Sequence, residues 1–381
     1  MKSSTLIHPV RYMRNRPFAR RVTQMYMSMG GRRGPTSKAL ELITDVVVRY
    51  FNDAIKKRPF EQRPARATRL LSEESSLAAH VAAYVAHGRN TFLLSPELVA
   101  MLDRTELDGV RAADINLPFD VFYISFGDAF EACLPGPPNK IDGAYINQTG
   151  SLPLQVLITS RRADVQSNRS NDWPFSRDRY FYAPLDNKDR ERTLGELVAA
   201  AVEKGEIQLK AELPKPENDN FHESEIPGLY VCDVRHETEK EHVEYIQQGL
   251  GAFRRALALA MNAICYMTAT SDEQRTPSYP EDAPADLVRA LESVRPAERQ
   301  RANAKLLDQG YVPIYFLRDE NRVRTPAEQT GREVSTHWRR GHWRRQAAGP
   351  GRATRLLRWI RPTLVRADKG DATTGHIYHA E

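Results

Sequence analysis

Residues 116–126 read NLPFDVFYISF, a run of aromatic and β-branched side chains that ends at Gly127. Such a composition is typical of a strand buried in a sheet. Three further segments, at 143–147, 154–159 and 179–182, also have strand character and are separated by Pro, Gly, Asn and Asp. Because these segments follow one another with turn residues between them, we predict an antiparallel sheet in the middle of the chain.

Helical periodicity surrounds these strands. In residues 38–57, apolar side chains such as Ile43 and Val47 recur every three or four positions, which predicts an amphipathic helix. Another helix is expected to have Pro96 at its first position. The remaining predicted elements are helices at 74–87, 193–204, 239–269, 285–294 and 296–309, and a strand at 312–317. The predicted fold class is therefore α+β, with an antiparallel sheet packed with helices, one long central helix and a C-terminal basic hairpin, and not a doubly wound parallel sheet.

The formal net charge of +6 conceals two basic ends around an acidic middle. Residues 1–38 contain nine lysines and arginines and no acidic residue, and residues 332–366 contain ten arginines against Glu333 alone. Such separation indicates attraction to an anionic partner, such as RNA, DNA or an acidic protein face. The same pattern also fits basic ends that fold back onto the acidic middle, and the sequence leaves both interpretations open.

These patterns divide the chain into five units. We predict a basic, flexible arm at 1–37, a helical region at 38–110, an α+β core at 111–331, a basic-aromatic hairpin at 332–368 and a tail at 369–381. The three cysteines are far apart and form no CxxC pair, so a reducing compartment fits best. No run approaches the roughly 20 apolar residues of a membrane span, and we expect a cytoplasmic protein without a membrane partner. The Arg-rich first segment, which lacks acidic residues, leaves a mitochondrial presequence as the alternative.

The C-terminal segment carries the strongest functional signal. Residues 337–346 read HWRRGHWRRQ, and residues 349–352 read GPGR, which is a turn sequence. We predict that strands at 334–346 and 354–365 pair antiparallel around this turn, with Pro362 at an edge or bulge. The candidate residues for binding nucleic acid or another partner are His337, Trp338, Arg339, Arg340, His342, Trp343, Arg344, Arg345, Arg352, Arg355, Arg358 and Trp359.

Alternation along a strand divides these side chains between two faces. One face would carry His337, Arg339, Gly341, Trp343 and Arg345, and the other Trp338, Arg340, His342 and Arg344. Arginine binds phosphate bidentately and stacks on rings, and an exposed indole stacks on an unpaired base. In the alternative interpretation the tryptophans belong to the core, while the arginines protect an edge strand or pair with the acidic middle. One buried and one exposed face would satisfy both interpretations.

No constellation in the sequence makes a convincing catalytic or metal centre. His337 and His342 are five positions apart, so neither a strand nor a helix directs both to one ion. Residues 233–239 collect titratable groups that a nuclease or hydrolase would use, but an acidic first helical turn also explains them. Cys232 and Cys265 lack a nucleophile context and are expected in the core. We predict a binding protein with no catalytic residue, no metal and no cofactor.

Residues 337–346, 349–352 and 359–362 resemble the C-terminal signature of a group of phage and plasmid proteins that includes type V-A anti-CRISPR proteins. The strand at 117–126 and the helix around Asn262 are also similar to that group. The resemblance implies a mobile-element protein in a bacterial host cell that lowers production of the type V-A CRISPR effector nuclease. The resemblance implies that the protein recognises the effector's nascent N-terminal peptide as it is translated. It also implies that loss of the messenger RNA accompanies this recognition. The message or the ribosome is a further expected partner.

Other functions stay open from the sequence alone. A nucleic-acid-binding protein of phage or plasmid origin would use the same basic segment. A metal-dependent nuclease would use carboxylates of the acidic middle, and a DNA-maintenance protein would show salt-dependent binding to duplex DNA. Relatives that share the C-terminal signature can also act on other targets, because such a signature can mark a common fold more than a common target.

Overall fold

The computed structural model describes residues 7–16, 18–29, 37–56, 67–134, 139–150, 153–162, 180–211, 221–223, 230–232, 239–270, 278–279, 283–309, 311–317 and 337–365. Its helices are α1 (His8–Asn15), α2 (Ala19–Ser28), α3 (Ser37–Lys56), α4 (Ala67–Ala86), α5 (Pro96–Leu102), α6 (Leu194–Ala211), α7 (Glu239–Ala269), α8 (Ala285–Ala290) and α9 (Pro296–Asp308). Its strands are β1 (Thr91–Leu94), β2 (Thr105–Glu106), β3 (Val121–Ser125), β4 (Cys133–Leu134), β5 (Asn139–Asn147), β6 (Leu154–Arg162), β7 (Tyr180–Leu185), β8 (Phe221–Glu223), β9 (Tyr230–Cys232), β10 (Ile314–Leu317), β11 (His337–Arg339), β12 (Gly341–Ala348), β13 (Thr354–Ile360) and β14 (Thr363–Val365).

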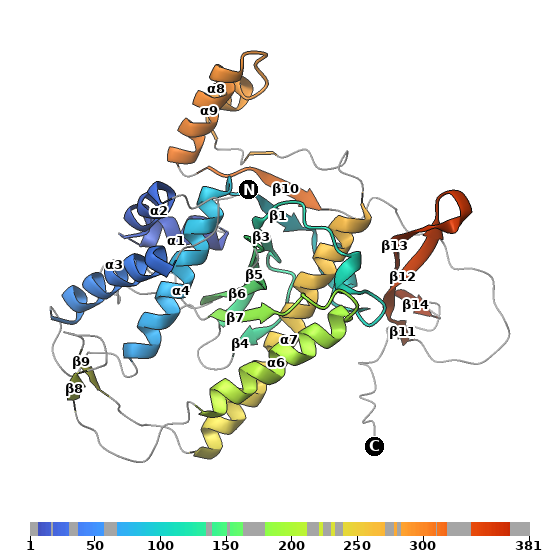
Figure 1. The fold of residues 1–381 in the computed structure, drawn as a ribbon, viewed down its shortest axis with the longest axis horizontal. Coiled ribbons are helices and arrows are strands. Elements are labelled where there is room, and N and C mark those ends of the chain that lie inside the picture. Colours follow the sequence, from blue (N-terminus) through green and yellow to red (C-terminus); the bar gives the residue numbers. More distant parts are fainter. Residues whose placement is uncertain are drawn as a thin grey trace.

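A mixed sheet forms the centre of the described structure (Figure 1). Its strand order is β10-β1-β3-β5-β6-β7, and β4 pairs with one end of β5. Strand β1 pairs in parallel with β10 and with β3, whereas β3, β5, β6 and β7 pair antiparallel in sequence order. The prediction of an antiparallel sheet therefore holds for four successive strands and is wrong for the sheet as a whole, which is mixed.

The parallel part of the sheet depends on β1, a strand that the sequence analysis did not predict. Its four residues are too few to display a periodic pattern. The connection from β1 to β3 passes through α5, and a crossover of this kind brings the chain back in the same direction. Helix α5 begins as predicted: Pro96 occupies its first turn, and the Ser95 side chain accepts a hydrogen bond from the backbone N–H of Leu98.

Helices cover both faces of the sheet, and β3 contacts both layers. All five of its residues are buried. Phe122 and Ile124 belong to the core shared with α6 and α7, whereas Val121 and Tyr123 belong to the core shared with α1 to α4. A strand that is buried on both faces has an uninterrupted apolar sequence, which accounts for the prominence of this segment in the chain.

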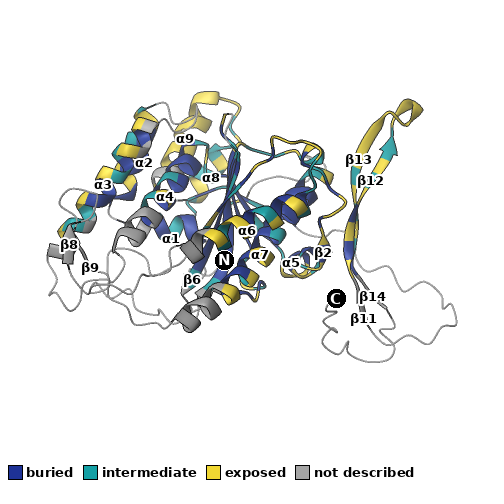
Figure 2. Ribbon diagram, turned by 60° about the horizontal axis from the view of Figure 1, so that its bottom comes forward, coloured by how far each residue is buried: buried dark blue, intermediate teal, exposed yellow. Residues whose placement is uncertain are grey.

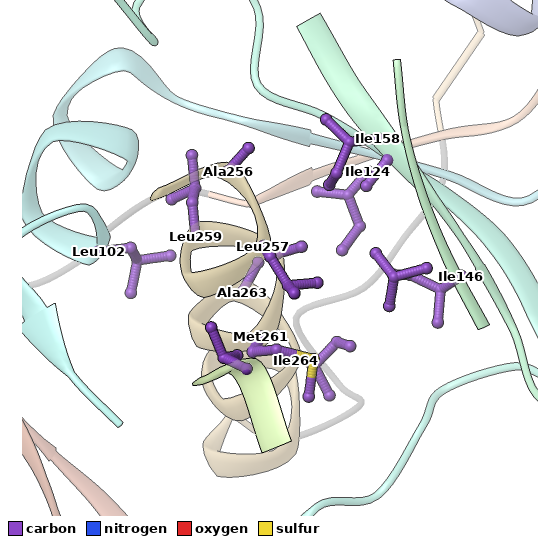
Figure 3. Close-up of a cluster of buried hydrophobic side chains, with 14 of the residues drawn as sticks. Leu102, Ile124, Ile146, Ile158, Ala256, Leu257, Leu259, Met261, Ala263 and Ile264 are labelled. Carbon is purple, nitrogen blue, oxygen red and sulfur yellow. The ribbon is translucent and has the colours of Figure 1, made fainter. Parts of the chain in front are cut away.

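Helix α7 supplies the centre of the larger core. Figure 3 shows Leu257 of α7 near Ile124, Ile146 and Ile158, which project from three neighbouring strands. All four side chains are fully buried. Because each buried aliphatic side chain contributes about 1.5–3 kcal/mol, this layer is a principal source of stability. No helix in the described ranges is both long enough and apolar enough to cross a membrane.

The first described residues form packed helices, which differs from the flexible arm expected for residues 1–37. Helices α1 and α2 and the turn between them bury Tyr12, Phe18 and Tyr26. Arg16 Nε donates to Glu74 Oε1 of α4 at 3.0 Å, and the two side chains are 7% and 2% exposed. The segment looks loose from its sequence because it contains basic residues and no acidic ones. The carboxylate that neutralises Arg16 belongs to Glu74, which lies far away in the sequence.

A buried polar cluster fixes α1 on the sheet. Arg11 donates to Asp142 Oδ2 and Thr159 donates to Asp142 Oδ1, each at 2.7 Å. His8 Nδ1 lies 3.1 Å from the Tyr145 hydroxyl. Burial alone would raise the pKa of Asp142, but Arg11 and the other polar neighbours outweigh this effect and hold the pKa below its usual value. Burial, followed by the charge of Arg11, lowers the pKa of His8 to about 3.

We expect His8 to make the protein less stable in mild acid. Its folded pKa of about 3 lies below the unfolded value of 6.5, so the unfolded chain binds more protons and stability is lost as the pH falls from about 6.5 toward 3. At about 1.4 kcal/mol per pH unit, wild type should lose about 2 kcal/mol more than His8→Gln between pH 7 and pH 5. Denaturant unfolding at a series of pH values measures this difference. Identical pH dependence in the two proteins would contradict a buried, neutral His8.

Candidate nucleic-acid interface

Strands β12 and β13 form an antiparallel hairpin that stands out from the body of the molecule (Figure 2). Its residue pairs run from His342 and Ile360 at the base toward a turn that contains a short 3₁₀ segment, Pro350–Arg352. Gly349 and Gly351 in this turn have φ values of 75° and 62°, which lie in the left-handed region that favours glycine. The two glycines therefore allow the chain to reverse.

The hairpin has two distinct faces, because directly opposed residues of an antiparallel pair lie on the same side. What we name the core face carries Trp343, Trp359, Arg345, Leu357, Ala347 and Arg355. What we name the outer face carries His342, Ile360, Arg344, Arg358, Gln346 and Leu356. Every residue of the outer face is exposed, whereas Trp343 is only 3% exposed. Strand β12 thus alternates between buried and exposed positions at its base.

Trp343 anchors the core face to the body. Its indole Nε1 donates to Asn262 Oδ1 of α7 at 2.8 Å. Asn262 Nδ2 in turn donates to the carbonyl oxygens of Leu102 and Thr105, at 3.0 and 2.8 Å. Asn262 is 1% exposed, and these bonds satisfy both ends of its amide. Sequence reasoning did not assign this role, although the signal was present as a single polar residue inside the most apolar run of the chain.

Trp359 extends the same anchor. Its ring stacks on Trp343 with a centroid distance of 5.9 Å and meets the edge of Tyr266 at 5.5 Å. Its Nε1 donates to Thr105 Oγ1 at 3.2 Å. Trp343 is too deeply buried to stack on a nucleic-acid base, and Trp359 is half-buried in the same stack. Both indoles therefore hold the hairpin in place, as the core interpretation expects of these two tryptophans.

The base of the hairpin joins the body through β2, which pairs in parallel with Gly341 and His342. A Cβ atom at Gly341 would lie 2.6 Å from Thr105 Oγ1 and 2.7 Å from Pro362 Cδ. Only glycine permits so close an approach. Pro362 is buried beside it, in the link between β13 and β14. The strand predicted at 354–365, with Pro362 at an edge or bulge, is therefore interrupted at this residue.

Two of the predicted binding arginines are neutralised within the molecule. Arg340 Nη1 lies 3.1 Å from Glu106 Oε1 of β2, and Arg345 Nε lies 3.0 Å from Asp114 Oδ1. Asp114 ends a short 3₁₀ helix, Ala112–Asp114, and its side chain is 11% exposed. For these two arginines the structure selects the interpretation in which the basic end folds back onto the acidic middle.

Four other predicted arginines, Arg344, Arg352, Arg355 and Arg358, are exposed. In the part of the chain that the structure describes, no ion pair involves any of them. Arg358 donates to Gln346 Oε1 at 3.0 Å, which orients its side chain along the outer face. The hairpin therefore presents cationic groups that the described carboxylates do not neutralise.

The remaining predicted residues lie at the start of the segment. In β11, His337, Trp338 and Arg339 pair antiparallel with the three residues of β14. The contacts of these three side chains, like the titratable residues at 233–238, fall outside the described part of the structure. His342 is exposed on the outer face.

The remaining chemical features concern metal ligands and thiols among the described residues. Within them, no group of three or more His, Cys, Asp or Glu side chains is placed to hold a metal ion. Cys265 is buried in α7, and burial raises the pKa of its thiol well above the usual value. A thiol in such surroundings stays protonated near neutral pH and is a poor nucleophile.

Comparison with known proteins assigns the chain to a family. The model of the AcrVA2-like group, the anti-CRISPR type V subtype A2 family, matches residues 92–367, a range that includes α7 and the hairpin. A solved crystal structure of AcrVA2 is 10% identical over 92% of this chain and 94% of that chain, with a TM-score of 0.35. No curated protein is similar enough to match the chain. Because the family model matches well over half of its residues, this protein belongs to the anti-CRISPR type V subtype A2 family.

Proposed function

We propose that this protein suppresses production of a type V-A CRISPR effector nuclease by recognising the effector's N-terminal peptide during translation and promoting loss of the messenger RNA. The observation that carries the proposal is the family match over residues 92–367. Membership indicates an anti-CRISPR function, and the route through the nascent peptide and its message is the further step that we propose.

The charge distribution on the hairpin supports this route. A protein that acts on a nascent chain works beside ribosomal and messenger RNA, both of which are polyanions. Exposed arginines without ion pairs among the described residues, such as Arg344 and Arg355, suit such surroundings because they attract phosphate over long distances. The nascent peptide would bind elsewhere on the molecule.

A translational reporter in bacteria tests the proposal. The first codons of a type V-A effector gene are fused to a fluorescent protein, and the anti-CRISPR chain is expressed in the same cell. We expect several-fold less fluorescence and a parallel fall in reporter mRNA, measured by quantitative PCR. Purified effector nuclease assayed with purified anti-CRISPR chain should keep its cleavage activity, because the proposed target is synthesis and not the finished enzyme.

Two matched reporters identify what is recognised. Synonymous recoding changes the message and keeps the peptide, whereas a pair of compensating frameshifts changes the peptide and nearly keeps the message. Repression should survive the recoding and disappear with the frameshifts. Repression that follows the nucleotides, or direct inhibition of the purified nuclease with no effect on the reporter, would refute the proposal.

A further inference from the structure

The outer face of the hairpin carries a pair of like charges that the fold does not require. Arg344 and Arg358 lie directly opposite each other on β12 and β13, and both are exposed. Like charges in this position destabilise a pair of strands. Among the described residues, Arg358 donates to Gln346 and no carboxylate pairs with either guanidinium, whereas the side chains that fix the hairpin to the body lie on the core face.

Local carboxylates do not relieve this repulsion. Residues 341–362 contain no Asp or Glu. The acidic side chains at the base of the hairpin, Glu106 and Asp114, form their ion pairs with Arg340 and Arg345. Charge continues toward the tip through Arg355 and through Arg352, which lies in the turn. Charge that no described carboxylate neutralises therefore extends along the hairpin from its middle to its end.

Apolar side chains lie among these charges. Leu356 is 61% exposed and Ile360 is 36% exposed, and they occupy positions of β13 on either side of Arg358 on the outer face. Exposed aliphatic side chains next to arginines are more typical of a contact surface than of a strand edge that only faces water. A partner that matches this face needs both negative charge and exposed apolar groups.

We propose that the outer face of the hairpin is a docking surface for single-stranded RNA. A phosphodiester chain that passes over Arg344 and Arg358 would remove their mutual repulsion, and Arg binds phosphate through paired N–H donors. Unpaired bases offer flat apolar surface to Leu356 and Ile360, whereas a duplex hides its bases in the stack. The choice of RNA over DNA rests on the proposed action on a message.

The anchor gives this surface a fixed orientation. The Trp343 indole and the Asn262 amide hold the base of β12 against α7, so the outer face is presented by a supported ribbon and not by a loose tail. Pre-ordering lowers the conformational entropy that is lost when a partner binds. The two tryptophans thus support RNA binding without contacting RNA, a different role from the base stacking considered for them from sequence.

The test measures affinity of the purified full chain for a fluorescent, unstructured oligouridylate by anisotropy at several salt concentrations. We expect Arg344→Ala/Arg358→Ala to weaken binding about tenfold or more, because each lost phosphate contact removes an electrostatic contribution. The slope of log K against log salt should become shallower by about 1.4, at roughly 0.7 per phosphate contact. Leu356→Ser/Ile360→Ser should weaken binding and leave that slope unchanged.

The matched control is Arg20→Ala/Arg21→Ala, which removes two exposed arginines from α2 and changes the net charge equally. The control should bind RNA like wild type and keep the wild-type thermal unfolding midpoint. Arg344→Ala/Arg358→Ala should unfold at the wild-type midpoint or slightly above it, because the repulsion between the two arginines is gone. Equal losses of affinity in the control and in Arg344→Ala/Arg358→Ala would overturn the proposal. Affinity for duplex DNA equal to that for oligouridylate would also overturn it. So would binding to an acidic protein without binding to oligouridylate. RNA binding in this assay is independent of reporter repression, so failure of either result leaves the other interpretable.

Discussion

Trp343→Ala should be the most damaging single substitution in the C-terminal segment, lowering the free energy of unfolding by about 3–5 kcal/mol. The substitution removes a buried indole that stacks on Trp359 and donates to Asn262. It leaves a cavity between the hairpin and α7, and it leaves the Asn262 acceptor buried without this donor. Guanidinium unfolding followed by fluorescence and circular dichroism measures the loss.

Two further variants separate packing from hydrogen bonding at this anchor. Trp343→Phe keeps most of the apolar contact and removes the N–H donor, so we expect a loss of about 1–3 kcal/mol. Arg344→Ala, on the adjacent exposed position, should stay within about 0.5 kcal/mol of wild type. A Trp343→Ala protein as stable as Arg344→Ala would show that the indole is not part of the core.

Glu74→Ala should destabilise the protein by a similar amount, about 3–5 kcal/mol, although its partner lies in a segment that reads as a flexible arm. The substitution removes the carboxylate that pairs with the buried Arg16 guanidinium. Losing one member of a buried ion pair costs more than the pair contributes, because the remaining charge stays in a poorly hydrated site. Thermal and denaturant unfolding, with limited proteolysis of the first helices, measure the effect.

The control for this pair is Glu41→Ala, which removes an exposed carboxylate from α3 and should change stability by less than about 0.5 kcal/mol. The double variant Arg16→Met/Glu74→Leu should be more stable than Glu74→Ala alone, since it removes both charges together. If Glu74→Ala matched the Glu41 control, α1 and α2 would not be docked as the structure places them.

The sequence predicts well those elements whose signal is local. Strand β3 combines an apolar run with a terminal glycine, and α5 begins with a serine cap and a proline. Strand β1 escapes prediction because four residues carry no period and because its parallel partners, β3 and β10, are brought beside it only by the tertiary fold. The direction of pairing in a sheet depends on connections, and composition does not reveal them.

The candidate site divides in the same way. Alternation sorts Trp343 and Arg344 onto opposite faces from sequence alone, but it does not say which face is buried. Asn262 decides that question, 81 positions away from Trp343. Net charge likewise indicated a basic end, whereas only the structure separates Arg345, paired with Asp114, from Arg344, which remains exposed.

The parallel pairing of β2 with β12 joins positions near residues 105 and 341. During the protein's own synthesis, the α7 helix and most of the sheet therefore leave the ribosome before the residues that seal them. The contacts that close the body at β2 can therefore form only after β12 has been made, because they join residues far apart in the sequence. An incomplete product that stopped before β12 would expose the Asn262 amide and its apolar neighbours, and it would be open to proteases.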